Sequence, residues 1–267
     1  MKYVQELRRL TRVATPWLDL KVSPVQTEGV LGAASASVLM KVLWLACVAR
    51  PELSKVVTHL AAYISRWTRE HDLCLRRLIS YISTTQDDVL VGYIGDKLSA
   101  CTLVGYTDSD FASCVRTKRS TSGQFTELIG PATRFPLSWS SRKQTSASQS
   151  TPEAEMIAAA ALLRRELLPL SEALGAISKV QIKVRLMEDN SACLLSIKTG
   201  MSKELRHLSR SHGVSVRALH EAVERGDIEL FQCPTALQKA DIFTKQIAPA
   251  LWSGLLDLLG MERSPKT

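Results

Sequence analysis

Three strand-like segments in a row, followed directly by one long helical pattern, constrain the fold of this chain more than any other feature. CTLVGYTD (101–108), GQFTELIG (123–130) and PLSWSSRK (136–143) read as strands separated by turn-forming residues. From residue 151 the apolar residues take the spacing of a helix, which continues to about Gly175. Adjacent strands predict an antiparallel meander, and a return through a helix predicts a parallel neighbour.

Further strands and helices alternate after the long helix. Residues 181–188 and 227–234 read as strands, whereas helical spacing covers residues 189–200, 208–226 and 236–247. The long helix has Ser150 or Thr151 as its cap, and Pro169 is expected to interrupt it. This order predicts an α/β protein in which helices pack against a mixed sheet.

The first part of the chain is predicted to be rich in α-helix. Helical spacing covers about 35–49, 52–66 and 69–84, and a strand-like VLVGYI follows at 89–94. Residues 30–49 are long enough to span a bilayer, but Lys41 near their middle costs about 2.5–3.5 kcal/mol there. We therefore expect a buried helix and no membrane span, with a domain boundary between residues 84 and 98.

Charge and cysteine content favour some partners and argue against others. The 34 Lys and Arg residues against 26 Asp and Glu give a formal net charge of +8, which favours polyanions, nucleic acid first. The six cysteines are scattered without a CxxC pair, which argues against a zinc site. MKYVQELRRLTRV at the start lacks the apolar core of a secretory signal, so we expect an intracellular protein of the cytoplasm or nucleus.

Acidic residues stand at several strand ends. In GYTDSDFA, Asp108 and Asp110 share one face of a strand end, where either metal binding or simple turn formation would explain them. Asp189 ends a later strand but also suits the cap of the next helix. Asp241 follows the last strand but also suits a solvated helical position.

Two glutamates lie in the first turns of the long helix. Glu153 and Glu155 are separated by about 200° around the helix axis, so one is expected to point inward and the other outward. A glutamate in this place also stabilises the positive end of the helix dipole, which explains Glu153 better than Glu155.

Together, Asp108, Glu155, Asp189 and Asp241 indicate a metal site. Mg²⁺ binds oxygen ligands and usually takes a few carboxylates besides waters and substrate phosphate. Two such ions about 3.5–4 Å apart can activate an attacking water and stabilise the leaving oxygen in phosphodiester hydrolysis. Spacing in the sequence does not by itself show that these four carboxylates converge.

Six motifs in this order resemble the ribonuclease H domain of copia-type retrotransposon Pol polyproteins: GYTDSDFA, RTKRSTSGQF, LSWSSRKQ, STPEAEM, EDNSA and ADIFTK. Residues 38–67 resemble, more weakly, the end of the reverse transcriptase region of the same polyproteins. The resemblance implies a ribonuclease H-like fold, with a five-stranded mixed sheet and flanking helices, preceded by a smaller α-rich segment. It implies three parts: residues 1–95, the ribonuclease H-like domain at 96–248, and a C-terminal helix and tail at 249–267.

The resemblance also implies hydrolysis of the RNA strand of an RNA–DNA hybrid with two Mg²⁺ or Mn²⁺ ions. The catalytic, metal-binding acids of the family fall on Asp108, Glu155, Asp189 and Asp241. Asp108 would bridge both ions, with Glu155 and Asp189 on the ion near the leaving 3′ oxygen and Asp241 on the ion that holds the water. Asp110 would then be a neighbour and not a ligand.

Basic and hydroxyl side chains near the strand ends are the candidate contacts to nucleic acid. Such groups bind backbone phosphates without regard to sequence. The candidates are Ser109, Arg116, Lys118, Arg119, Ser120, Thr121, Ser122, Arg142 and Lys143. A solvated loop accounts for any one of them, whereas the cluster suits a hybrid-binding enzyme. A proton-shuttle role for His207 or His212 is left open.

The predicted function is thus a metal-dependent endoribonuclease acting on RNA–DNA hybrids, at the C-terminal end of a polyprotein whose reverse transcriptase is a further partner. One alternative is a catalytically decayed module that binds nucleic acid, which hybrid binding without cleavage would favour. Another is an integrase-like polynucleotidyl transferase of the same fold, which strand transfer on duplex DNA would favour.

Overall fold

The computed structural model describes residues 2–18, 27–114, 116–202 and 204–263, which divide into two compact units. The first contains the described residues of Met1–Leu90, Gln246–Asp257 and Met261–Thr267, and the second contains those of Val91–Lys245 and Leu258–Gly260. Within these described ranges, every helix is too short or too polar to cross a lipid bilayer.

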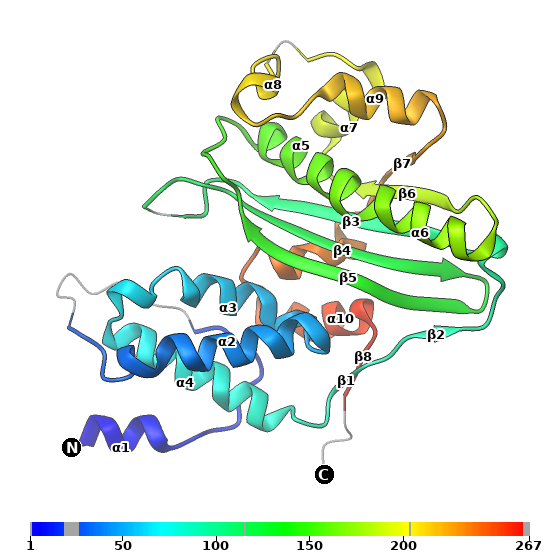
Figure 1. Cartoon of the computed structure of the whole chain (residues 1–267). Helices are drawn as coiled ribbons and strands as arrows, with labels where there is room; N and C mark the ends of the chain where they lie inside the picture. The colour runs from blue at the N-terminus through cyan, green and yellow to red at the C-terminus, as the bar shows by residue number, and fades with distance from the viewer. Residues whose placement is uncertain (1, 19–26, 115, 203, 264–267) are drawn as a thin grey trace. The chain divides into compact units, whose positions relative to one another are not determined.

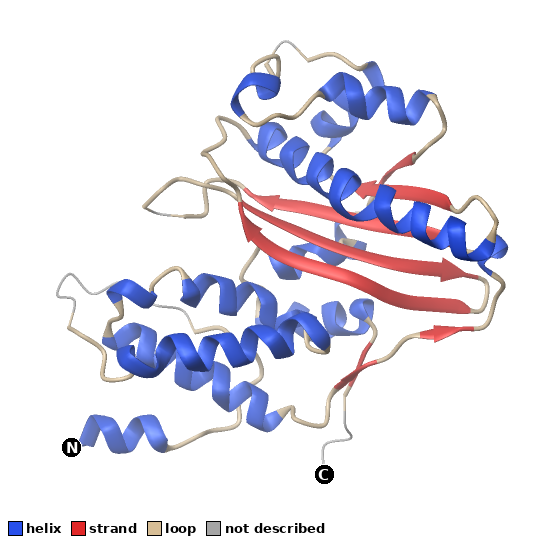
Figure 2. Cartoon of the chain, in the orientation of Figure 1, coloured by secondary structure: helices blue, strands red, loops and turns tan. Residues whose placement is uncertain are grey.

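The first unit is helical, as the apolar spacing predicts (Figure 2). Its helices are α1 (Lys2–Arg8), α2 (Gly32–Val48), α3 (Ser54–Ala61), α4 (Arg69–Thr84) and most of α10 (Pro249–Leu259), with short 3₁₀ helices at Pro51–Leu53 and Ile64–Arg66. The continuous helix expected over 52–66 is wrong, because α3 is flanked by these two tighter turns. Strands β1 (Val89–Leu90) and β8 (Met261–Glu262) form an antiparallel pair.

A buried aspartate fixes the entrance of α2. The Asp72 carboxylate in α4 accepts hydrogen bonds from the backbone N–H groups of Val30 and Leu31, at 2.8 and 3.0 Å, and from the indole N–H of Trp67 at 2.7 Å. Backbone N–H groups at a helix start lack partners within the helix, so this carboxylate stabilises the position where α2 begins.

The second unit is built on a six-stranded mixed sheet in the order β2-β5-β4-β3-β6-β7 (Figure 1). The strands are β2 (Tyr93–Ile94), β3 (Thr102–Asp110), β4 (Thr121–Gly130), β5 (Thr133–Lys143), β6 (Lys183–Glu188) and β7 (Glu229–Gln232). The pairs β2–β5, β5–β4 and β4–β3 are antiparallel, whereas the pairs β3–β6 and β6–β7 are parallel.

The structure contains the five predicted strands and the flanking helices, which confirms the α/β, ribonuclease H-like fold. Strand β2 is an additional short strand at the edge of the sheet. The single strand expected over 89–94 is wrong. Its first half pairs with β8 and its second half with β5, so the segment divides between two sheets.

One face of the sheet is covered by a long helical segment (Figure 1). It consists of α5 (Thr151–Leu162), a π-helical turn (Leu163–Leu167) and α6 (Leu168–Ser178). Pro169 has no N–H for the carbonyl of Arg165, so the regular ladder cannot continue, and the predicted interruption appears as the π turn just before it. The segment ends at Ser178, near Gly175 as predicted, where Lys179 takes the left-handed conformation.

The connection from β6 to β7 contains α7 (Ser191–Thr199), α8 (Leu208–Ser211) and α9 (Val216–Glu224). The continuous helix expected over 208–226 is wrong. Gly213 between α8 and α9 has a φ of +64°, which a right-handed helix does not permit. The three helices still provide the crossover that a parallel strand requires.

The opposite face of the sheet holds the segment that carries Asp241. Neighbouring residues of a strand point to opposite faces: Gln124 donates a hydrogen bond to the Ala158 carbonyl in α5, whereas Gly123 faces Ala240. Ala240 belongs to the 3₁₀ helix η6 (Lys239–Phe243), which follows a separate 3₁₀ turn, η5 (Thr235–Leu237). The longer helix expected over 236–247 is wrong, because Gln238 between the two turns is extended.

Four contacts hold η6 against the sheet. Gln238 donates to the Thr107 carbonyl at 3.0 Å, and the Ser141 hydroxyl donates to the Phe243 carbonyl at 2.6 Å. The Phe243 ring stacks on Phe125, with centroids 6.2 Å apart. Finally, Lys239 forms an ion pair with Glu127, and both side chains are buried. These contacts fix the position of Asp241 relative to β3.

The close approach of η6 requires glycine at position 123. A Cβ atom there would lie 2.6 Å from the Ala240 carbonyl oxygen and 2.9 Å from Phe243 Cβ. We expect Gly123→Ala to lower the free energy of unfolding by about 1–3 kcal/mol, because backbone must move to accommodate the methyl group. In α10, Gly254→Ala is the matched control, since its Cβ would meet no atom within 4 Å. Thermal denaturation should show no loss for the control, and equal losses for both variants would contradict the packing argument.

The buried ion pair yields a second prediction. Lys239→Met leaves Glu127 as a buried charge, and removing one partner of such a pair typically costs about 3–5 kcal/mol. We expect the lower end of this range, because Arg134 Nε still lies 3.7 Å from Glu127. The double variant Lys239→Met/Glu127→Leu removes both charges and should recover most of the loss in chemical denaturation. A double variant no more stable than Lys239→Met would show that the uncompensated carboxylate is not the cause.

Candidate metal centre

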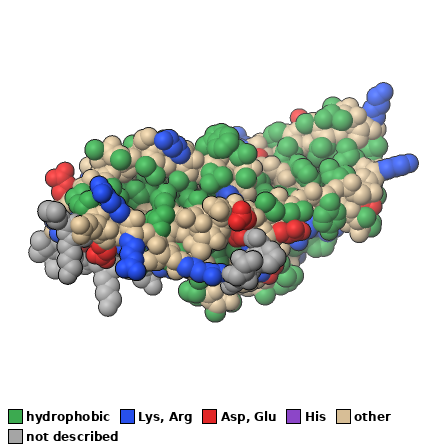
Figure 3. All heavy atoms as spheres, turned by 90° about the horizontal axis from the view of Figure 1, so that it is seen from below, with side chains coloured by type: hydrophobic (Ala, Val, Ile, Leu, Met, Phe, Trp, Pro, Cys, Tyr) green, Lys and Arg blue, Asp and Glu red, His purple; other side chains and the backbone are tan. Residues whose placement is uncertain are grey.

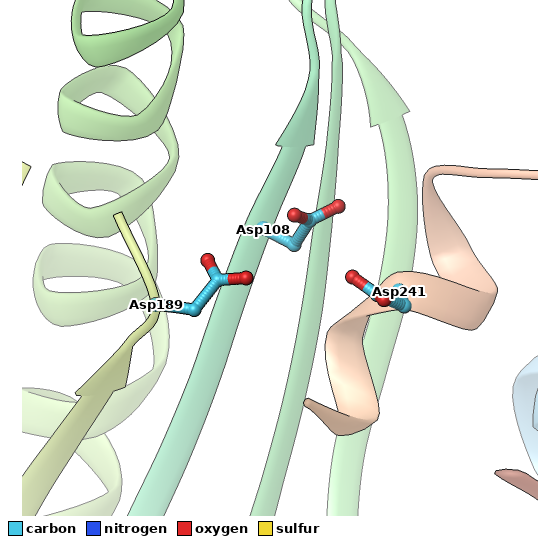
Figure 4. Close-up of side chains that lie close together, drawn as sticks. All are labelled: Asp108, Asp189 and Asp241. Carbon is cyan, nitrogen blue, oxygen red and sulfur yellow. The ribbon is translucent and has the colours of Figure 1, made fainter. Parts of the chain in front are cut away.

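Three aspartates from three elements face a common space at one end of the sheet (Figure 4). Asp108 lies in β3, Asp189 directly follows β6, and Asp241 lies in η6. One carboxylate oxygen of each lies within 4.8 Å of the others. The parallel pairing of β3 and β6 explains part of this, because Tyr106 is opposite Met187 and the two aspartates each follow two residues later.

Asp108 is the most enclosed of the three, with 2% of its surface exposed. One of its oxygens accepts a hydrogen bond from the Thr244 hydroxyl. The other lies 3.0 Å from the Lys245 ammonium, which is also 2.7 Å from Asp241 Oδ1. Lys245 therefore bridges two of the three carboxylates.

The pKa values in the centre reflect this crowding. Burial, and next the charge of Asp108, raise the pKa of both the Asp189 and the Asp241 carboxyl groups. Burial lowers the pKa of the Lys245 ammonium, but the charges of Asp108 and Asp241 outweigh it and raise that pKa overall. Lys245 thus stays protonated, but its single positive charge does not offset the three carboxylates.

Glu155 approaches the same centre from α5, on the other face of the sheet. It is 3% exposed, and its Oε2 has no hydrogen-bond partner among the described residues. Burial, followed by the charges of Glu188 and Asp108, raises the pKa of its carboxyl group. Its oxygens are not in the group that lies within 4.8 Å, so the structure brings together three of the four predicted ligands and places the fourth beside them.

Glu188 is a further acid of the centre that the sequence analysis missed. It is fully buried at the end of β6; its Oε1 accepts from the Asn190 N–H at 3.0 Å, whereas Oε2 has no partner in the described structure. Burial and the charges of Asp189 and Asp108 raise its pKa. Strand alternation carried the signal, because Glu188 lies on the same face as the buried Val184 and Leu186.

The structure corrects the expectation that one of the paired glutamates in α5 points outward. Glu153 is 1% exposed, accepts from the Gln149 N–H at 2.9 Å, and lies 3.3 Å from the Nε2 atoms of both His207 and His212. The His212 Nδ1 is 3.0 Å from the Ser146 hydroxyl. His212 therefore connects the segment before α9 to the start of α5, whereas His207 Nε2 has no hydrogen-bond partner among the described residues; neither histidine has a described contact with the three aspartates.

The donor set fits a hard divalent cation. Every candidate ligand is a carboxylate oxygen, which suits Mg²⁺ or Mn²⁺ better than softer metals. Two buried oxygens, one each of Glu155 and Glu188, have no hydrogen-bond partner in the described protein and are available as further acceptors. Like charges this close also need positive charge between them.

The candidate nucleic-acid contacts divide into two groups. The side chains of Ser109, Ser120, Thr121 and Ser122 are buried, whereas those of Arg116, Lys118, Arg119, Arg142 and Lys143 are exposed. Two of the buried hydroxyls form hydrogen bonds within the protein: Ser120 accepts from the Ala112 N–H at 3.1 Å, and Ser122 accepts from Gln144 at 2.9 Å. Their contact with phosphate stays a prediction.

Two of the exposed basic residues line a cavity of about 270 Å³ beside β4, β5 and α5. Arg142 and Lys143 are joined there by Arg164, Arg165 and His212, of which the two arginines lie in the π turn. On the face drawn in Figure 3, by contrast, basic side chains are scattered among apolar, uncharged and acidic ones. The positive charge of this cavity was missed because its residues lie far apart in the sequence.

No family model matches the chain, but it is similar to a secreted effector protein and to Pol polyproteins of transposons. Over 117 residues, 44% of the chain, it is 33% identical to Secreted RxLR effector protein 161 of Plasmopara viticola and covers 78% of that protein. Over 218 residues, 81% of the chain, it is 25% identical to the Retrovirus-related Pol polyprotein from transposon RE1 of Arabidopsis thaliana. The chain spans only 14% of the length of that polyprotein.

A solved structure of LC11-RNase H1, isolated from compost, aligns with 54% of this chain and 92% of its own, at 16% identity and a TM-score of 0.36. The fold assignment rests on the strand order observed here, in which three antiparallel strands are followed by two parallel ones. The chain is thus similar over four fifths of its length to retrovirus-related Pol polyproteins of transposons, and its second unit has a ribonuclease H-like fold.

Proposed function

We propose that the second unit is a metal-dependent endoribonuclease that hydrolyses the RNA strand of RNA–DNA hybrids, within a copia-type Pol polyprotein. The observation that carries this proposal is the convergence of Asp108 in β3, Asp189 directly after β6 and Asp241 in η6. Carboxylates gathered in this way are the ligands that phosphodiester hydrolysis with bound Mg²⁺ requires. The similarity to Pol polyproteins supplies the context in which such hybrids arise.

The proposed assignment is two ions, Mg²⁺ or Mn²⁺, which when bound supply the positive charge for water activation and for the leaving oxygen. Asp108, which lies in the central strand β3, is assigned to both ions on the resemblance to the ribonuclease H domains of such polyproteins. Asp189 and Glu155 are assigned to the side of the leaving 3′ oxygen and Asp241 to the side of the water. Glu155 contributes its unpartnered buried oxygen.

The exposed basic residues are proposed to bind the hybrid. Arg116, Lys118 and Arg119 lie in the loop after β3, while Arg142 and Lys143 end β5. The register of β4 and β5 places Arg142 opposite Ser122 and Lys143 opposite Thr121, so these side chains share one end of the sheet with Asp108. Contacts to phosphate and to 2′-hydroxyls would give recognition without sequence preference.

The remaining assignments are proposals as well. Residues 1–95 are assigned to the end of a reverse transcriptase region, 96–248 to the nuclease and 249–267 to a C-terminal helix and tail. The rest of the reverse transcriptase is the proposed protein partner, and the proposed compartment is the cytoplasm or nucleus.

Cleavage of a labelled RNA–DNA hybrid in Mg²⁺ tests the activity. Asp108→Asn and Asp189→Asn should each lower the rate by about 100-fold or more, because each removes the negative charge of a proposed metal ligand. Asp110→Asn is the matched control, since Asp110 ends the same strand on the same face but is not in the group of three. It should retain near-wild-type cleavage.

Two outcomes would contradict the proposal. A folded wild-type protein that binds hybrid and leaves it intact would indicate a decayed binding module. Joining of duplex DNA strands, in place of hybrid cleavage, would indicate an integrase-like transferase.

Cys114 offers a test of the proposed substrate loop. Partial burial raises the pKa of its thiol, but the polar groups of Thr117 and Lys143 outweigh this and lower it to about 6. Most of the thiol is therefore ionised at pH 7 and should react quickly with iodoacetamide. The Lys143 ammonium lies 3.1 Å from the Cys114 sulfur, so hybrid bound at Lys143 should slow the alkylation several-fold. Mass spectrometry can follow this, with the exposed Cys47 as reference. Equal labelling with and without hybrid would place the substrate elsewhere.

A further inference from the structure

Lys245 occupies a place in the centre that the metal-ion assignment leaves unexplained. Its ammonium lies 3.0 Å from Asp108 Oδ1 and 2.7 Å from Asp241 Oδ1, which are hydrogen-bonding distances to two oxygens assigned to metal. An ammonium and a divalent cation cannot share these oxygens at such distances, because they repel each other and need the same space. Binding of an ion between Asp108 and Asp241 therefore requires Lys245 to leave.

The two carboxylates do not depend on Lys245 for their positions. Asp108 is also held by the Thr244 hydroxyl and is fixed in the central strand β3. Asp241 is fixed by η6, whose docking relies on Gln238, Lys239 and Phe243. Loss of the ammonium would therefore leave both carboxylates in place.

Lys245 itself is able to move. Its side chain is 40% exposed, and it follows the last residue of η6 and its cap at Thr244. The lysine side chain has four flexible carbons and a compact, strongly hydrated charge, so it exchanges protein contacts for water at little cost. Lys239, six residues earlier, is not a substitute, because it is buried in its pair with Glu127.

We propose that Lys245 is a displaceable internal cation, which neutralises Asp108 and Asp241 in the metal-free protein and leaves the site when a divalent ion binds between them. The inference rests on the proposed function for the identity of the ion. It adds that the ammonium competes with the ion, so metal affinity is set partly by a residue that is not a ligand. It also explains how the fold tolerates these carboxylates before metal is bound.

Calorimetric titration with Mn²⁺ tests the competition on the full chain. Lys245→Met and Lys245→Gln should bind Mn²⁺ roughly tenfold more tightly than the wild type, because no ammonium must be displaced from its two partly exposed ion pairs. Lys245→Arg keeps the charge and should bind no more tightly than the wild type. Lys198→Met, an exposed lysine of α7, controls for the change in net charge and should leave the affinity unchanged.

Thermal denaturation and chemical labelling provide readouts that do not depend on activity. Without metal, Lys245→Met should melt below the wild type, and saturating Mn²⁺ should raise its melting temperature more than it raises that of the wild type. In the wild type, acetic anhydride should label the Lys245 amine several-fold faster with Mn²⁺ than without it. This last measurement needs no variant, so it decides the matter even where a variant does not fold.

The outcomes separate this inference from the proposed function. Unchanged Mn²⁺ affinity in both neutral variants, or metal-independent labelling of Lys245, overturns the displaceable cation, while hybrid cleavage by the wild type would leave the nuclease proposal standing. Absence of Mn²⁺ binding in the wild type and in every variant overturns both, since there would be no ion to compete with.

Discussion

Repulsion between carboxylates is the constraint on which the rest of the second unit depends. Five acidic side chains meet at one end of the sheet: Asp108, Glu155, Glu188, Asp189 and Asp241. Burial removes the water that would screen them, and it is the largest cause of the raised pKa values of Glu155, Glu188, Asp189 and Asp241. A fold holds such a group together only if its scaffold is rigid enough to resist repulsion. The long β3–β4–β5 meander, with α5 on one face and η6 on the other, supplies that rigidity.

Two lysines near η6, Lys239 and Lys245, neutralise different carboxylates. Lys239 is buried against the rings of Tyr106 and Phe125 and pairs with Glu127, far enough into the sheet that burial lowers its pKa. Its role is to fix η6 in place. Lys245 lies at the more exposed end of the same segment, and its described ion pairs are with Asp108 and Asp241. The buried Lys239 thus stabilises the position of η6, whereas the partly exposed Lys245 contacts the carboxylates of the site.

The sequence predicts the strands and the long helix because their hydrophobic periods are local properties. It also identifies Asp108, Asp189 and Asp241, whose positions at strand ends follow from the same periods and from the resemblance. It does not predict η6 as a 3₁₀ helix, because that geometry depends on the contacts of Gln238 and Phe243 with β3, β4 and β5, far away in sequence. It predicts that one of Glu153 and Glu155 points outward, because helix geometry alone does not reveal that two histidines approach Glu153 from the segment before α9.

The paired aspartates of β3 show how tertiary packing selects between chemically equal residues. Asp108 and Asp110 share one face of the strand, so local geometry does not distinguish them. Their partners on β4 do: Asp108 is opposite Gly123, whereas Asp110 is opposite Thr121. Only glycine allows the Ala240 carbonyl and Phe243 to approach as closely as they do, and this approach brings Asp241 and Lys245 to Asp108. A missing side chain on the neighbouring strand therefore decides which aspartate joins the centre, and Asp110 remains at the rim.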